Sequence, residues 1–231
     1  MNSNNKTTRD AISFQTSGEL FKASSDWASI VENFPYGLGA LIFYILLFQS
    51  TLIPGWLSVW GILGAILLVG MGVLRLFGYP VIFLAIPIIV NELVLAVWLI
   101  VTGFNTSAIV YIIVGVLFIT ALASSMVSGS YLKSKDDPDY LTTVSANEKQ
   151  MLIGVLLMVV LTISVVSIPI MMFPILREHN ESLALLYVGA RIFEGFFDIV
   201  ILLGYLNLLT LSREFVKAGT PAAETDSNEI K

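Results

Sequence analysis

The stretch Ser182–Ser212, SLALLYVGARIFEGFFDIVILLGYLNLLTLS, decides how the rest of the chain must be arranged. It is apolar and longer than the about 20 residues that a helix needs to cross a bilayer. Three charged residues nevertheless lie near its middle, namely Arg191, Glu194 and Asp198. Their i, i+3 and i+7 spacing places them on one face of a helix. A charge at the centre of a bilayer costs about 2.5–3.5 kcal/mol on insertion scales, so this face must point into protein or a wet cavity.

Composition indicates a membrane protein. Of the 231 residues, 56% are hydrophobic and only 13% are charged, whereas a soluble domain has about 25% charged residues. The net charge of −5 argues against nucleic acid as a partner, because phosphate binding needs clustered Lys and Arg. The chain has no Cys, which excludes disulfides and thiol nucleophiles. We therefore predict the cell membrane as the location and the lipid bilayer as the main partner.

Hydrophobic periodicity predicts an all-α, polytopic membrane fold with six transmembrane helices and an N-terminal amphipathic helix. The predicted domains are a polar tail with an amphipathic interfacial helix over 1–33, a six-helix transmembrane bundle over 34–212, and a charged, disordered tail over 213–231. For the amphipathic segment, the alternative is a cytosolic helix packed on the end of the bundle.

The six spans are bounded by turns and by changes in composition. They are expected at about 34–48, 56–74, 81–102, 108–127, 146–173 and 182–212. Pro87 is expected to kink the third span, and Pro169 and Pro174 to bend or end the fifth, because proline removes a hydrogen bond inside a helix.

The third span adds two polar residues, Asn91 and Glu92, near mid-membrane depth. We expect Glu92 to pair with Arg191, because a carboxylate on a facing helix can take the guanidinium fork with two hydrogen bonds. Glu194 is one turn away on the same helix, so it can orient Arg191 but is poorly placed for a head-on bidentate contact. Asp198 is expected to be the least well paired. The candidate site is therefore an intramembrane polar cluster, consisting of Asn91, Glu92, Arg191, Glu194 and Asp198.

Two functions from different classes fit this polar cluster. Ionisable residues inside a membrane are functional candidates, so the bundle would bind or move a small polar solute or a cation. Alternatively, the protein is a structural or regulatory membrane subunit, and the cluster is an inter-helix lock. A water-accessible cavity would favour transport, and a dry, fully packed cluster would favour the lock.

Motifs for catalysis or cofactor binding do not occur. The one histidine, His179, has no Cys partner, so no zinc site is expected. The chain contains no H-E-x-x-H motif, nucleotide-binding glycine motif or nucleophile elbow. We expect no metal, no cofactor and no enzymatic activity.

Five blocks of the sequence are distinctive: TLIPGWLSVWGILGA (51–65), IPIIVNELVLAVWLIVTGFN (86–105), DPDYLTTVSANEKQMLIGVLL (137–157), FPILREHNESLALLYVGARIFEG (173–195) and LLTLSREFVKAG (208–219). They resemble an uncharacterised prokaryotic membrane-protein family catalogued as domain of unknown function 4386. The first two blocks resemble the end of that family and the other three its beginning and middle. The order suggests a circular permutation, in which 108–218 corresponds to the first part and 14–105 to the second. The resemblance implies a six-span α-helical fold and no assigned activity.

The distribution of Lys and Arg predicts that both termini are cytoplasmic. With six spans the termini share a side, and ten of the twelve Lys and Arg residues fall there. Arg177 lies on the other side and Arg191 inside a span. Cytoplasmic loops carry the excess of these residues. The resemblance implies the opposite orientation, because the basic loops of the family align with the turns at QSTLIPG, VTGFN and ILREHN.

Overall fold

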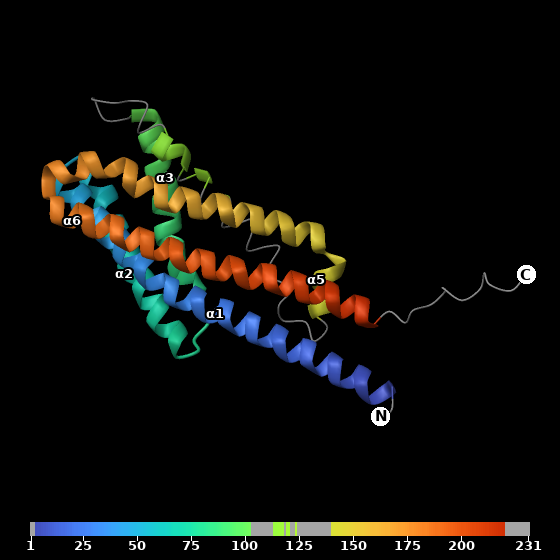
Figure 1. The fold of residues 1–231 in the computed structure, drawn as a ribbon. Helices are drawn as coiled ribbons and strands as arrows, with labels where there is room; N and C mark the ends of the chain where they lie inside the picture. Colours follow the sequence, from blue (N-terminus) through green and yellow to red (C-terminus); the bar gives the residue numbers. More distant parts are fainter. Residues whose placement is uncertain (1–2, 103–112, 118, 121–122, 124–139, 220–231) are drawn as a thin grey trace, which may run out of the picture.

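The computed structural model describes residues 3–102, 113–117, 119–120, 123 and 140–219, and these residues form helices and turns only (Figure 1). The all-α class is therefore confirmed. The helices are α1 (Ser3–Ser50), α2 (Gly55–Leu76), the 3-10 helix η1 (Ile82–Ala85), α3 (Ile86–Thr102), α5 (Tyr140–Ala146) and α6 (Glu148–Gly219). Most of the predicted fourth span, 108–127, lies outside the described residues.

Four helical segments of the described chain are long and apolar enough to cross a membrane. They are Ile12–Ser50, Gly55–Leu76, Ile82–Thr102 and Glu148–Ala218. Large apolar side chains also cover the outside of these helices, as expected for surfaces that face lipid. The protein is therefore a multi-pass membrane protein that contacts the bilayer.

α6 consists of two antiparallel limbs. The backbone leaves the helical conformation at Asn180, where φ is −158° and ψ is 102°, and the helix folds back there (Figure 1). The Asn180 side chain accepts a hydrogen bond of 3.0 Å from the backbone N–H of Leu183, which satisfies an unpaired donor at the start of the following helix. We call residues 148–179 the first limb and residues 181–219 the second limb.

The prolines neither kink α3 nor end the first limb of α6. Pro87 is the second residue of α3, so it begins this helix instead of kinking it; a missing N–H costs nothing in the first turn. Pro169 and Pro174 lie inside the first limb, which continues past them. Helices in membranes tolerate proline where neighbouring groups satisfy the freed carbonyls.

α1 runs without a break from Ser3 to Ser50, although Pro35 lies inside it. No helix end therefore coincides with the predicted boundary at residue 33. The N-terminal half of α1 packs along the second limb, where the side chain of Ser25 lies so close to Gly204 that an added Cβ would overlap it. The interfacial placement of residues 1–33 stays a prediction.

The C-terminal end of α6 is longer than the predicted span. Helix extends to Gly219 and so includes the first residues of the predicted tail, 213–231. The rest of the predicted tail, 220–231, lies outside the described residues. Near this end, the Phe215 ring contacts Phe14 of α1 with a centroid distance of 6.2 Å, so the ends of α1 and α6 lie side by side.

Two groups of buried apolar side chains hold the helices together. The larger group joins α1, α2, α3 and α6 and includes Tyr44, Leu57, Leu95, Ile168 and Tyr187. The smaller group joins α5 and both limbs to α1 and includes Ala28, Tyr140, Met151, Tyr205 and Leu208. The polar cluster lies among residues of α1, α3 and α6 that these two groups bring together.

Gly61 allows α1 and α2 to approach each other, because a Cβ there would overlap the buried ring of Tyr44. We expect Gly61→Ala to lower the midpoint of thermal unfolding in detergent. Overpacking costs about 1–3 kcal/mol, more than the about 1 kcal/mol that alanine contributes to a helix. Gly70→Ala, in the same helix, is the matched control, since nothing lies within 4 Å of its added Cβ. Equal destabilisation by both substitutions would contradict this account of the contact.

Candidate functional site

All five residues of the predicted polar cluster are buried, and none is more than 6% exposed. On the second limb, the apolar residues between the charged ones point the other way, and Phe193, Phe196 and Ile199 are each about half exposed. The charged stripe therefore faces protein and the aromatic stripe faces outward, as the cost of exposing charge to lipid requires.

Arg191 is paired within its own helix. Its Nη1 lies 2.8 Å from Oε2 of Glu194, one turn along the second limb. The guanidinium also lies over the ring of Tyr36, with Cζ 5.2 Å from the ring centroid, a distance at which the ring face attracts a cation. Glu194 was expected to orient Arg191 without a bidentate contact, and the ion pair consists of this single Nη1–Oε2 contact, which an i, i+3 spacing allows.

Glu92 has a different partner from the one predicted. Its Oε2 accepts a hydrogen bond of 3.0 Å from the hydroxyl of Tyr36, and the ion pairs of the described residues do not include one between Glu92 and Arg191. The predicted direct pair is therefore wrong. Tyr36 stands between the two groups, so α1 links α3 to the second limb with one aromatic side chain.

Asn91 belongs to a separate contact. Its Nδ2 donates a hydrogen bond of 3.0 Å to the backbone carbonyl of Leu57 in α2. Consecutive residues of a helix point about 100° apart, so Asn91 faces α2 where Glu92 faces α1. Asn91 therefore positions α3 for the charged groups, and its hydrogen bond within the described part of the chain goes to α2 rather than to Arg191 or Glu194.

Asp198 interacts with Thr162 of the first limb and with the carboxyl group of Glu32 of α1. Among the described residues, no donor reaches Oδ2 of Asp198. The expectation that Asp198 is the least well paired member therefore agrees with the structure. A carboxyl group so placed is suited to hold a proton or a cation.

Glu32 and Tyr36 were missed by the sequence analysis. Glu32 lies within the predicted amphipathic segment, 1–33, and neither Glu32 nor Tyr36 was included in the predicted polar cluster. The signal was their i, i+4 spacing, which puts them on one face of α1. Gly39 continues that face, and an added Cβ there would lie 3.1 Å from Cδ of Arg191. A glycine at this position leaves room for the stem of Arg191.

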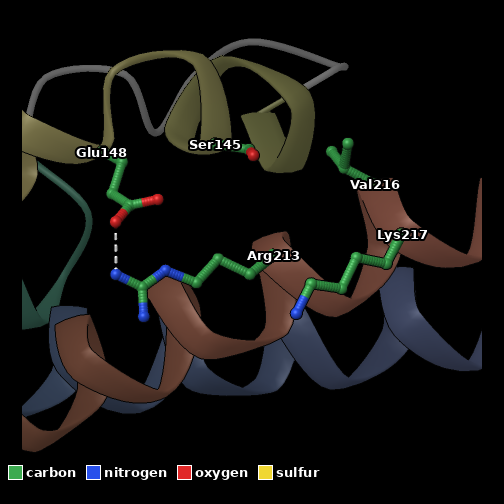
Figure 2. A pocket seen from close by; sticks show the side chains of 5 residues that line it. All are labelled: Ser145, Glu148, Arg213, Val216 and Lys217. Carbon is green, nitrogen blue, oxygen red and sulfur yellow. Dashed lines mark hydrogen bonds and ion pairs between the residues drawn. The ribbon is translucent and has the colours of Figure 1, made fainter.

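A second polar site lies at the far end of the two limbs. It is a pocket of about 450 Å³ lined by Ser145, Glu148, Arg213, Val216 and Lys217 (Figure 2). Arg213 forms an ion pair with Glu148 across the limbs, so its charge is already compensated. Exposed ion pairs contribute little free energy, and the pocket is a weaker candidate than the buried cluster.

The pairing of Arg191 can be tested by substitution. We expect Arg191→Met to destabilise the protein by about 3–5 kcal/mol, because it leaves a buried carboxylate without its counter-charge. Adding Glu194→Gln should recover more of this loss than adding Glu92→Gln, since Glu194 holds the ion pair. Denaturation of the purified protein in detergent measures the effect. Arg177→Met, at an exposed position, should change stability by less than about 0.5 kcal/mol. Equal recovery by the two second-site substitutions would contradict the assignment.

Comparison with protein families gives a match to the family described as domain of unknown function (DUF4386), over residues 2–103 and 107–230. Neither the comparison with curated proteins nor the comparison with solved structures gives a match. The matched residues cover nearly the whole chain and include all members of the polar cluster. The chain therefore belongs to the DUF4386 family.

Proposed function

We propose that this membrane protein binds a small cation at the buried carboxyl groups around Arg191 and moves it across the bilayer. The observation that carries the proposal is Asp198, which is 2% exposed and receives no hydrogen bond at Oδ2 from the described residues. An ionised carboxylate that is buried and incompletely paired is costly. A bound cation or proton removes that cost.

The charge balance of the region supports the proposal. The acidic side chains that interact electrostatically here are Glu32, Glu92, Glu194 and Asp198. Among the described residues, Arg191 is the one buried cationic side chain. Arg75 lies at the end of α2, where its Nη2 donates a hydrogen bond of 3.3 Å to Ser29 Oγ. Even with both guanidinium groups counted, the acidic groups are in excess, and protons or cations neutralise such an excess.

A structural role is the second candidate. The members of the cluster are buried, and Tyr36 joins α1 to both α3 and α6. These contacts favour an inter-helix lock. The ion pair between Arg191 and Glu194 lies within one helix, however, so it does not hold two helices together. The lock therefore depends on Tyr36, whereas transport depends on Asp198.

The proposed topology has six spans with both termini in the cytoplasm. Each limb of α6 exceeds the about 20 residues needed for a crossing, and the limbs are antiparallel (Figure 1). With α1, α2, the η1–α3 segment and the predicted span at 108–127, this makes six crossings. The concentration of Lys and Arg on the side of the termini supports the orientation.

Circular permutation of the family's order remains part of the proposal. The family match falls into two segments, 2–103 and 107–230, which meet at the predicted junction between the third and fourth spans. The contact between Phe14 and Phe215 supports the idea, because helix ends that lie together can be joined in a relative with a different chain order.

Ion flux into liposomes tests the proposed function. Purified protein should move protons or monovalent metal ions down a gradient, and Asp198→Asn should abolish this movement without unfolding the protein. Glu178→Gln, at an exposed position in the turn of α6, is the matched control and should leave flux unchanged. If the wild-type protein neither binds nor moves any of these ions, and Tyr36→Phe lowers the unfolding midpoint strongly, the protein is a structural subunit.

Labelling of introduced cysteines tests the topology. The chain has no Cys, so Ser107→Cys and Ser134→Cys each introduce one unique thiol. We expect a membrane-impermeant maleimide to label the first position from outside intact cells and the second only after the cells are opened, because the two predicted loops lie on opposite sides. Labelling of position 134 in intact cells would reverse the orientation.

A further inference from the structure

The contact between Glu32 and Asp198 brings together two acidic groups from different helices. Ser25 of α1 meets Gly204 of the second limb and Gly39 meets Arg191. These two contacts place Glu32 opposite Asp198 on the antiparallel helices, and the two carboxyl groups interact. Carboxylates carry acceptors only, whereas a protonated carboxyl group has one O–H donor. The two side chains can therefore form a hydrogen bond only when one of them holds a proton.

The neighbouring donors that the structure describes do not reach Oδ2 of Asp198. The hydroxyl of Thr162 donates a hydrogen bond of 2.9 Å to the backbone carbonyl of Met158. Arg191 donates to Glu194 at 2.8 Å, and Arg75 donates to Ser29 at 3.3 Å. Asp198 Oδ2 is buried without a donor among the described residues, so it is an unpartnered acceptor facing an acid.

We infer that Glu32 and Asp198 form a carboxyl pair that shares one proton, and that the cation carried by the protein is this proton. The second statement rests on the proposed function; the first stands without it. A shared proton satisfies both acids with a single O–H group, because a carboxyl–carboxylate hydrogen bond is charge-assisted and short. A divalent metal ion would need about six or more oxygen ligands, which a pair of carboxyl groups does not supply.

Charges on all the surrounding helices bear on the pair. Arg75 from α2 and Arg191 and Glu194 from α6 interact electrostatically with the pair. Glu92 of α3 accepts a hydrogen bond from Tyr36 of α1, whose ring lies under the Arg191 guanidinium. The pair is therefore surrounded by both negatively and positively charged side chains. When the pair retains one proton, its net charge is a single negative charge.

The side chains of Asp198 and Glu32 differ in how exposed they are. Asp198 is buried, whereas Glu32 is only half-buried and lies one turn along α1 from Ser29, which Arg75 contacts at the end of α2. A proton can therefore reach Glu32 from the end of the bundle where α2 ends, and pass to Asp198 through their shared hydrogen bond. Glu32 is the entry group and Asp198 the inner group.

Infrared difference spectroscopy of the protein in liposomes tests the pair. Stepping the pH should reveal the carbonyl stretch of a buried protonated carboxyl group that shifts in D₂O. We expect this band to be lost in both Glu32→Gln and Asp198→Asn, because each removes one half of the pair, and to be retained in Glu178→Gln. Labelling the wild-type protein with ¹³C-aspartate should shift the band, which tests the assignment without any substitution.

The outcomes separate the pair from the transport proposal. A band that persists in either Glu32→Gln or Asp198→Asn, or that ¹³C-aspartate and ¹³C-glutamate both leave unshifted, would overturn the pair. A band that behaves as expected in a protein that moves no protons would support the pair and overturn proton transport. Flux of Na⁺ or K⁺ without proton flux would preserve the proposed function and overturn the identity of the ion.

Discussion

Arg191 carries a permanent positive charge, because a guanidinium group stays protonated in proteins. This charge lies inside a helix bundle that is surrounded by lipid. The charge must be compensated locally. Glu194 supplies the opposite charge at 2.8 Å, Tyr36 supplies the face of an aromatic ring, and Gly39 supplies space for the aliphatic stem. These requirements fix which faces of α1 and α6 meet.

The fold-back of α6 follows from the same requirement. A second limb with a charged face cannot leave that face open to lipid, and the first limb covers it from one side while α1 covers it from the other. Small residues make this possible: an added Cβ at Gly195 would lie 2.8 Å from Cγ2 of Val166 in the first limb. Close backbone approach replaces the hydrophobic driving force that is missing between helices in lipid.

Much of the fold could be predicted from the sequence, because it depends on composition and on spacing along one helix. The i, i+3, i+7 stripe at Arg191, Glu194 and Asp198 settles which face is buried without knowledge of any other helix. Partners across helices depend on depth and rotation, which single-sequence patterns do not contain. The prediction therefore paired Arg191 with Glu92. It did not include Glu32 in the polar cluster, since an amphipathic pattern does not distinguish a water-exposed surface from a buried polar contact.

Under the proposed transport function, Arg191 also bears on which ion could pass. Its guanidinium interacts electrostatically with Asp198, and it lies over the ring of Tyr36, whose hydroxyl donates a hydrogen bond to Glu92. A metal ion bound near these carboxyl groups would lie close to a fixed positive charge in surroundings of low dielectric constant, where repulsion is strong. The same charge opposes a proton, but a proton binds a carboxylate through a covalent O–H bond and needs no shell of oxygen ligands. The residue that forces the helices together would then also select against metal ions, which would join the structural role and the proposed transporting role of the cluster in one side chain.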